Sequence, residues 1–301
     1  MRIVLNFALR IPRYAFAMFY PTQPFTLSFE LFPPKTPTAE EALWDHLEQL
    51  MVFKPDVVTC TYGAGGSTRA KTLDIVDRVR RQFGVRVASH LTCVGSTVDQ
   101  LRDYLIEAEQ RGIENIVALR GDPPKGETEF TPVEGGLQFA SELVELIRHE
   151  FPRFGIAVAG YPETHQEAAS PQADLENLKR KVDAGGHCVI TQLFYDNSDF
   201  FRFRQRCQEF GISAPIVPGI MPVTNLSQIQ RITSLCKAKL PADLVTELSE
   251  NNDADLQFEV GVRWAARQVQ ELIEAGIPGL HFYVLNKSTA TAAVLNQVRR
   301  P

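Results

Sequence analysis

Several features that identify common protein classes are missing from this 301-residue sequence. No uncharged run reaches the roughly 18 residues of a transmembrane helix, so no membrane span is expected. Basic and acidic residues are mixed along the chain, with a formal net charge of −5, and no long basic run suggests nucleic acid. The five cysteines form no C-x-x-C pair, which favours buried, reduced thiols in a cytoplasmic protein.

Signatures of several enzyme classes are missing as well. The six histidines form no H-x-H or H-E-x-x-H, so a metal hydrolase is not expected and no metal site is predicted. No lysine lies inside a candidate strand, which argues against a Schiff-base aldolase. The segment "YGAGGS" lacks the G-x-G-x-x-G spacing, so a bound dinucleotide would not use a Rossmann loop.

The first 25 residues differ from the rest of the chain. They contain Arg2, Arg10 and Arg13 but no acidic residue. Arginines interrupt the apolar run and no small-residue cleavage site follows, so a signal peptide is not indicated. We interpret residues 1–25 as an N-terminal arm, with a true translation start near Met18 as the alternative.

Short β-branched runs, each followed by a helical pattern, recur about every 30 residues, the length of one strand–helix unit. The candidate strands are 26–31, 56–62, 85–92, 115–120, 155–161, 187–194, 214–220 and 279–285. Eight parallel units fit a closed α/β fold, the (β/α)₈ barrel, better than an open sheet. We therefore predict a single barrel domain over residues 26–301, with extra helices at about 241–250 and 254–275 before the eighth strand.

The intervening helices have readable ends. Thr38 is the expected N-cap of the first helix, which has acidic residues in its first turn. Gly112 is expected to end the third helix, and Pro171 to open the fifth.

Barrel enzymes hold their chemistry at the C-terminal ends of the strands. Polar residues expected there are Glu30, Thr59, Thr61, Tyr62, His90, Thr92, Arg120, Asp122, Tyr161, Glu163, His165, Gln192, Asn286 and Lys287. Most polar residues at strand ends are ordinary loop or capping residues, so each of these residues alone is weak evidence for an active site.

Glu30 is the most informative of these residues. It lies in the apolar segment "SFELFPPK", and strand alternation points its side chain into the barrel. A buried carboxyl group is protonated, paired or functional. An apolar setting would raise its pKa and suit it to act as a general acid near neutral pH.

A phosphate group could be held at the end of the barrel where the strands have their C-termini, because helix N-termini gather there and attract anions. The segment "NLKRK", residues 177–181, adds three positive charges on one helix. The alternative is an ordinary solvated helix face.

An ordered set of motifs resembles one enzyme family. The motifs are "SFELFPPK", "VTCTYGAGG", "SHLTC", "IVALRGDPP", "AGYPETH", "QADLENLKRKVDAGG", "ITQLFYD", "FRFRQRC", "IVPGIMPVTN" and "HFYVLNKS". Together they are similar to the methylenetetrahydrofolate reductases, from residue 26 to about 297.

The resemblance implies a barrel that binds FAD. It also implies reduction of 5,10-methylenetetrahydrofolate to 5-methyltetrahydrofolate, with hydride passing from NADH or NADPH through the flavin, and a role in methionine synthesis. The chain resembles the short prokaryotic form, which lacks the regulatory domain of eukaryotic relatives. A homo-oligomer that acts on small molecules is expected.

By this resemblance, Glu30 is the acid that protonates the folate, and Asp122 is the carboxylate that binds the pterin beside the flavin. The positions matching flavin contacts are Tyr62, Ala64, His90, Arg120, Gly121, Asp122, Ala140, Tyr161, His165, Ala168, Asp174, Asn177, Arg180 and Lys181. The positions matching substrate contacts are Thr61, Asp122, Gln192, Gln228 and Lys287.

Two departures and two alternatives remain. Gly186 replaces a common alanine near the flavin helix. Lys287 stands where relatives often have arginine, so a bidentate grip on folate becomes a point charge. A flavin-free pterin-binding methyltransferase barrel is one alternative, and a non-catalytic folate- or flavin-binding module is the other. Neither the choice between NADH and NADPH nor the oligomeric interface can be read from the sequence.

Overall fold

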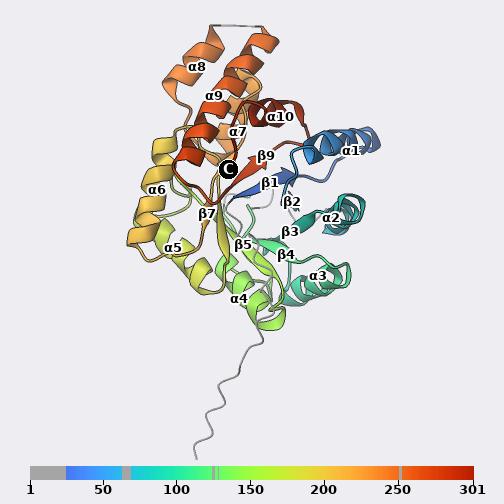
Figure 1. Ribbon diagram of the computed structural model, residues 1–301. Helices are drawn as coiled ribbons and strands as arrows, with labels where there is room; N and C mark the ends of the chain where they lie inside the picture. Colours follow the sequence, from blue (N-terminus) through green and yellow to red (C-terminus); the bar gives the residue numbers. More distant parts are fainter. Residues whose placement is uncertain (1–24, 63–68, 124–125, 128, 251–252) are drawn as a thin grey trace, which may run out of the picture.

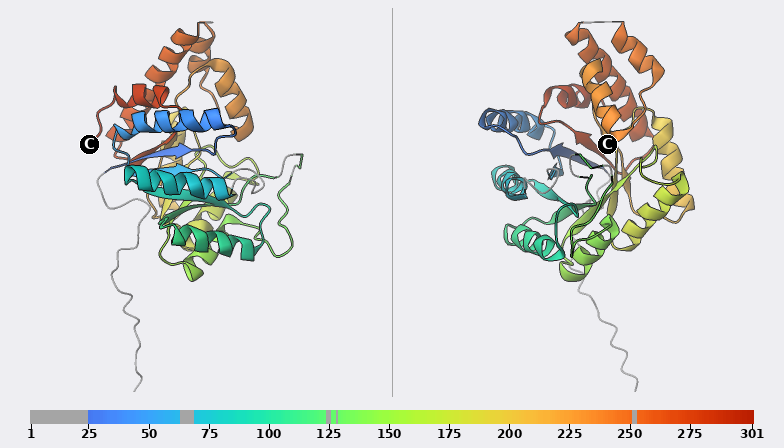
Figure 2. Two further views of the ribbon diagram at one scale, coloured as in Figure 1. Left: turned by 90° about the vertical axis from the view of Figure 1, so that its right-hand side faces the viewer. Right: turned by 180° about the vertical axis from the view of Figure 1, so that it is seen from behind.

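A computed structural model describes residues 25–62, 69–123, 126–127, 129–250 and 253–301 of the chain. Within these ranges, strands and helices alternate along the sequence, and the helices surround one central sheet (Figures 1 and 2). Of the predicted N-terminal arm, residues 1–24 lie outside the described ranges.

All neighbouring strands in the sheet are parallel, in the order β7-β6-β5-β4-β3-β2-β1-β9-β8. The strands are β1 (Thr26–Leu31), β2 (Val57–Cys60), β3 (Arg86–Thr92), β4 (Asn115–Leu119), β5 (Gly155–Gly160), β6 (Cys188–Thr191), β7 (Ile216–Val217), β8 (Gly219–Ile220) and β9 (Gly279–Tyr283). Each of the eight predicted strands is present, and the predicted strand at 214–220 is divided into β7 and β8.

Pro218 divides this seventh strand, because proline has no N–H group to donate to a neighbouring strand. One half, β7, pairs with β6, and the other half, β8, pairs with β9. Side chains complete the seam: the Gly219 amide donates to Thr191 Oγ1 at 2.9 Å, and the Tyr283 hydroxyl donates to the Thr191 carbonyl oxygen at 2.7 Å. The result is a nearly closed (β/α)₈ barrel, as predicted.

The helices form the outer layer of the barrel (Figure 2). They are α1 (Pro37–Met51), α2 (Arg69–Phe83), α3 (Val98–Gln110), α4 (Ala140–Glu150), α5 (Pro171–Asp183), α6 (Asn197–Glu209), α7 (Leu226–Cys236), α8 (Ala242–Ser249), α9 (Ala254–Glu274) and α10 (Thr289–Leu295). The predicted extra helices before the last strand correspond to α8 and α9.

Helix α1 corrects one prediction. Its N-cap is Thr36, not Thr38, because Thr36 Oγ1 accepts a hydrogen bond from the Ala39 amide at 3.2 Å. Pro37 takes the first helical position, where its missing N–H group costs nothing. The glycine expected to end α3, Gly112, has φ of 71° and follows the helix as predicted.

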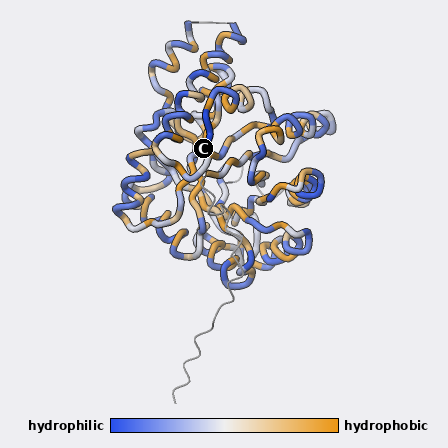
Figure 3. The backbone as a smooth tube through the Cα atoms, viewed as in Figure 1, coloured by the Kyte–Doolittle hydropathy of each residue, from blue (hydrophilic) through white to orange (hydrophobic). Residues whose placement is uncertain are grey.

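Small and medium apolar side chains pack against one another inside the barrel. They are Val57, Ala88, Val117, Ala157, Cys188, Ile190 and Val217. A larger apolar layer lies between the strands and the helices, and Figure 3 shows apolar and polar residues alternating along those helices. Because the interior is packed, the space for a ligand lies at the C-terminal mouth.

Two further predictions from composition can be compared with the structure. Among the described residues, no helix is long and apolar enough to cross a membrane. All five cysteines are free thiols. Four of them are buried, as predicted, whereas Cys236 is only half-buried.

Candidate active site

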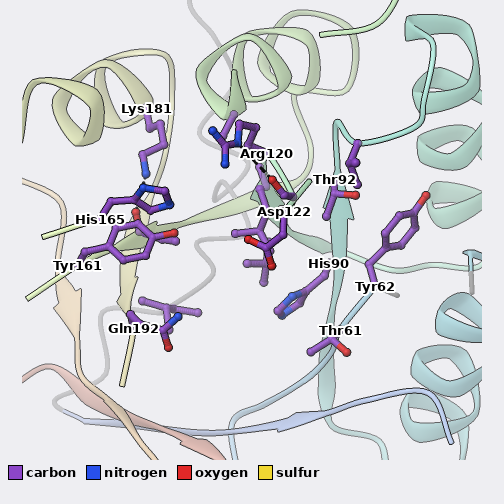
Figure 4. A pocket seen from close by; sticks show the side chains of 18 of the residues that line it. Thr61, Tyr62, His90, Thr92, Arg120, Asp122, Tyr161, His165, Lys181 and Gln192 are labelled. Carbon is purple, nitrogen blue, oxygen red and sulfur yellow. Dashed lines mark hydrogen bonds between the residues drawn. The ribbon is translucent and has the colours of Figure 1, made fainter. Parts of the chain in front are cut away.

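A cavity of about 650 Å³ opens at the C-terminal ends of the strands, a volume typical of a small-molecule site. Side chains from strands throughout the barrel point into it (Figure 4). The predicted site residues that line it are Glu30, Thr61, Tyr62, His90, Arg120, Gly121, Asp122, Ala140, Tyr161, His165, Ala168, Asp174, Asn177, Arg180, Lys181 and Gln192.

Two of the site residues assigned by the family resemblance do not line this cavity, and a third falls outside the described ranges. Ala64 lies outside the described residues. Gln228, in the first turn of α7, accepts a hydrogen bond from the Thr224 hydroxyl instead. Lys287 is exposed and lies two residues beyond Leu285, which does line the cavity.

Glu30 lies near the end of β1, with 16% of its side chain exposed. Its Oε2 is 3.2 Å from His281 Nε2 and 3.3 Å from His90 Nε2. The His281 contact has hydrogen-bond geometry, whereas His90 Nε2 approaches the carboxylate without that alignment. Of the three alternatives for a buried carboxyl group (protonated, paired or functional), the structure therefore shows that Glu30 is paired.

The two imidazoles correct the predicted protonation of Glu30. Burial is the largest single influence on its pKa and raises it, as expected for a carboxyl group in an apolar site. The attraction of His90 and His281, together with the hydrogen bond from His281, outweighs burial and lowers the pKa of Glu30 to about 2. Glu30 is thus an ionised carboxylate near neutral pH, and a proton that it delivers must come from its partners.

His281 is a site residue that sequence reasoning missed. Its Nδ1 lies 2.8 Å from Ser28 Oγ, and that hydroxyl donates to the Leu280 carbonyl oxygen at 3.2 Å. In the β1–β9 pairing, His281 lies opposite Ser28, so both face the barrel interior with Glu30. The available signal was the alternation of polar residues in "GLHFY", where His281 and Tyr283 occupy every second position.

The turn after β4 presents Asp122 to the cavity (Figure 4). Gly121 has φ of 91°, and a Cβ atom at this position would lie 2.7 Å from Val94 Cγ1. Arg120 Nε donates to the Gly121 carbonyl oxygen at 3.2 Å. Glycine is required here for both conformation and space, and it sets the direction of the exposed Asp122 carboxylate.

One end of the cavity is cationic. Lys181 Nζ donates to the Ala159 carbonyl oxygen at 2.6 Å, and burial lowers the pKa of Lys181 to about 8, although Asp174 partly opposes this. Arg180 lies beside it on α5 and is exposed. Lys181 is therefore protonated at neutral pH but close to losing its charge.

Arg120 forms an ion pair with Glu167, a second site residue that sequence reasoning missed. Its two terminal nitrogens donate to both oxygens of Glu167, at 2.6 and 2.8 Å. This bidentate ion pair ties the end of β4 to the loop before α5, and it lowers the pKa of Glu167. The sequence offered no signal, because the two residues are 47 positions apart.

The loop between β5 and α5 is held at several points. Both carboxylate oxygens of Glu163 accept from the Lys239 amide, at 3.1 and 3.0 Å. Asp174 accepts from the His165 amide at 3.0 Å. Thr164 between them has φ of 85°, an unfavourable conformation for a β-branched residue. These contacts hold a strained loop beside the cavity.

Another part of the cavity wall is largely apolar. Its lining residues there are Leu193, Met221, Ile232, Tyr283 and Leu285. Helix α9 fixes the adjoining loop, because Trp264 Nε1 donates to the Tyr195 carbonyl oxygen at 3.1 Å and Gln268 Nε2 donates to that of Phe194 at 2.9 Å. The cavity thus joins a cationic end to an apolar side.

The residues present suit a large polar cofactor. Thr92 Oγ1 is buried at the cavity wall and has no hydrogen-bond partner within the described residues. Such an atom is satisfied when a ligand supplies a polar edge. Lys181 and Arg180 suit phosphate groups. No cluster of three metal-ligating side chains occurs in the part of the chain that the structure describes.

Comparison with known proteins agrees with this geometry. The family model for methylenetetrahydrofolate reductase matches residues 17–299. The 5,10-methylenetetrahydrofolate reductase of Escherichia coli (strain K12) is 40% identical over 269 residues, covering 89% of this chain and 88% of that protein. Methylenetetrahydrofolate reductase (NADH) 1 of Arabidopsis thaliana is 40% identical over 279 residues, and the chain spans only 47% of that protein.

A solved structure supports the fold. An uncharacterised Clostridium thermocellum protein, described as binding two copies of 5-methyl-5,6,7,8-tetrahydrofolic acid, aligns with a TM-score of 0.58. The alignment covers 91% of this chain and 93% of that protein at 13% identity. From the match over residues 17–299 and the identity to bacterial relatives, the chain belongs to the methylenetetrahydrofolate reductase family.

Proposed function

We propose that this protein reduces 5,10-methylenetetrahydrofolate to 5-methyltetrahydrofolate, with FAD as cofactor and a nicotinamide nucleotide as electron donor. The observation that carries the proposal is the Glu30–His281 pair in the mouth of a barrel of this family. Relatives with 40% identity carry this activity in their names, and the plant relatives are named for NADH.

FAD would occupy the cavity with its phosphates at the cationic end. Lys181 and Arg180 would supply positive charge, and Asp174 could accept from ribose hydroxyls. When bound, the flavin supplies the hydride chemistry, taking hydride from the nicotinamide and passing it to the one-carbon unit of folate. The flavin-contacting residues proposed by family resemblance include Ala64, which lies outside the described residues.

Glu30 would deliver the proton that opens the methylene bridge of folate. Because its carboxylate is ionised, the proton would come from the imidazole whose Nε2 meets Glu30 Oε2 with hydrogen-bond geometry, which is that of His281. A folate nitrogen that approaches Glu30 Oε2 takes this proton through the carboxyl group. The Ser28 hydroxyl at His281 Nδ1 fixes the orientation of the ring during this transfer.

Asp122 would act by its charge. Its carboxylate points into the cavity on a turn whose direction Gly121 fixes. A negative charge there binds the pterin and stabilises the cationic folate intermediate. Gln192 and Thr61 line the same space and would contact the two substrates in turn, whereas Gln228 and Lys287 would contact folate from the rim.

The remaining proposals concern context. The enzyme would act in the cytoplasm on small molecules, in the pathway to methionine, as a homo-oligomer without nucleic-acid or membrane partners. Residues 26–301 would form the catalytic barrel, and residues 1–25 an arm outside it.

The test uses the absorbance of the purified protein. The proposal expects a flavin spectrum, either as purified or after adding FAD, that bleaches anaerobically with NADH or NADPH and recovers on adding methylenetetrahydrofolate. The same titration with each donor decides the nucleotide preference. A protein that binds no FAD, or a bleached flavin that folate leaves unchanged, would contradict it.

A further inference from the structure

The ends of β1 and β9 are joined beyond the last rung of their ladder. Regular pairing runs from Thr26 with Gly279 to Glu30 with Tyr283. One residue past β1, the Phe32 amide donates to Asn286 Oδ1 at 3.0 Å, and Asn286 Nδ2 donates to the Phe32 carbonyl oxygen at 2.8 Å. A single side-chain amide thus takes the place of a missing strand residue.

The chain cannot continue this ladder by itself. Pro33 and Pro34 follow Phe32 and have no N–H groups to donate. Phe32 therefore provides the last backbone donor at this end of β1 before Lys35. Beyond the regular β1–β9 ladder, the two hydrogen bonds of the Asn286 side chain join Phe32 to the segment after β9.

The Asn286 side chain reaches Phe32 because its backbone is unusual. Leu285 and Asn286 have φ of 50° and 55°, in the left-handed region that residues other than glycine seldom adopt. The turn is closed by the Lys287 amide, which donates to the Val284 carbonyl oxygen at 2.9 Å. Strained backbone of this kind is retained where surrounding contacts require it, and it is concentrated at functional sites.

The joined segments surround the proposed proton donor. Glu30 lies two residues before Phe32, and His281 lies five residues before Asn286. Phe32 and Leu285 both line the cavity, on either side of the junction. Asn286 itself does not line the cavity, so it acts on the site through these neighbours.

We propose that Asn286 is a positioning residue for the folate half of the reaction: its amide holds the end of β1 against the end of β9 and so keeps the Glu30 carboxylate within hydrogen-bond distance of His281 Nε2. The inference rests on the proposed function, because it assigns Asn286 to the proton delivery proposed there. It goes further by naming a residue that contacts neither substrate nor cofactor.

Two variants separate this role from a general loss of folding. Asn286→Gly accepts the positive φ angle and removes only the side chain. Asn286→Asp keeps the acceptor for the Phe32 amide, but its carboxylate repels the Phe32 carbonyl oxygen; when protonated, it can donate to that oxygen again. Asn296→Asp, at the exposed end of α10, introduces the same charge away from the cavity and is the control.

The first measurement is anaerobic stopped-flow kinetics of each half-reaction. For Asn286→Gly, we expect flavin reduction by the nicotinamide within about twofold of wild type, and oxidation by saturating folate at least about tenfold slower. The Asn286→Asp rate of folate reduction, relative to wild type, should rise at least about fivefold from pH 8 to pH 5.5 as the carboxyl group gains its proton. An unchanged folate rate in Asn286→Gly, or a flat ratio in Asn286→Asp, overturns the inference.

The second measurement requires no turnover. Nitrogen-15 NMR of the histidine side chains reports on the hydrogen bond between His281 Nε2 and Glu30 in the folded protein at a fixed pH. We expect the His281 Nε2 resonance to move in Asn286→Gly and to stay unchanged in Asn296→Asp. An unchanged His281 resonance in Asn286→Gly overturns the positioning role, even if wild-type protein reduces folate. A wild-type protein that cannot reduce folate overturns the proposed function alone, because the NMR result still tests how Asn286 affects the contact between Glu30 and His281.

Discussion

At the scale of single residues, the chemistry depends on a carboxylate held between two imidazoles. Glu30 keeps its negative charge because His90 and His281 stabilise it more than burial opposes it. The three side chains therefore form one proton-holding unit, in which the proton and the group that delivers it belong to different residues. Removing the carboxylate should affect only the step that needs a proton.

That step can be isolated with Glu30→Gln. We expect the variant to bind FAD and accept hydride from the nicotinamide at near wild-type rate, because neither process needs the proton. Reduction of methylenetetrahydrofolate should fall by about 10²- to 10⁴-fold, the usual contribution of a general acid. Anaerobic stopped-flow absorbance measures both halves, with Glu41→Gln on the exposed face of α1 as control. If both half-reactions survive in Glu30→Gln, the acid is another residue.

Lys181 leads to a prediction on pH. Its pKa, lowered to about 8 by burial, means that the ammonium ion at the cationic end loses its proton as pH rises through 8. Affinity for an anionic cofactor should therefore be constant below about pH 7 and fall above pH 8. Fluorescence titration of flavin-stripped protein with FAD measures this. Lys181→Met should bind weakly with no such dependence, whereas Lys179→Met, which removes a lysine paired with Asp183, should retain it. Equal pH profiles for wild type and Lys181→Met would contradict the assignment.

The sequence predicted which residues gather at the mouth better than how they are charged. Alternation along β1 and the position of strand ends placed Glu30, Asp122 and Gln192 correctly around one cavity. The pKa of Glu30 was predicted in the wrong direction, because its partners His90 and His281 lie on other strands and only the barrel brings both imidazoles to the carboxylate. Local sequence shows burial, but charge pairing depends on register between distant strands.

At the scale of secondary structure, the seam where β7 and β8 meet their neighbours is closely packed. Spacing predicted one strand at 214–220, and Pro218 was the signal that it would be divided. Pattern alone could not show that the two halves pair with different neighbours, since register follows from tertiary packing. The helix α7, which supplies Ile232 to the cavity, was likewise not predicted.

Gly219 should be essential for closing this seam. A Cβ atom there would lie 2.2 Å from the Thr191 carbonyl oxygen and 2.6 Å from the Tyr283 ring. We expect Gly219→Ala to lower the free energy of unfolding by about 3 kcal/mol or more, because backbone must move. Gly211→Ala, where the φ angle is 73° but no atom lies within 4 Å, should cost about 1 kcal/mol. Urea denaturation compares the two, and equal costs would show that the seam tolerates the methyl group.

At the scale of the whole molecule, the cavity is built from nearly every unit of the barrel. Its lining comes from strands β1, β3, β4, β5, β6 and β9, from loops that include those after β2 and β8, and from helices α4, α5 and α7. Repetition of the strand–helix unit made the barrel predictable from sequence, because each unit carries its own pattern. No single strand–helix unit forms the cavity alone. Binding of a ligand in the cavity should therefore stabilise all of the units together.

This coupling can be measured by ligand-induced stabilisation. At a free FAD concentration of 100 times Kd, binding should add about 2.7 kcal/mol to the free energy of unfolding. Because the lining residues come from strands around the whole ring, this gain should appear as one cooperative transition at higher Tm, with slower hydrogen exchange in β1, β3 and β5 together. Helix α8, which supplies no lining residue, should gain protection only through global unfolding. Protection limited to α5 and its preceding loop would mean that the phosphate end binds the cofactor without engaging the rest of the barrel.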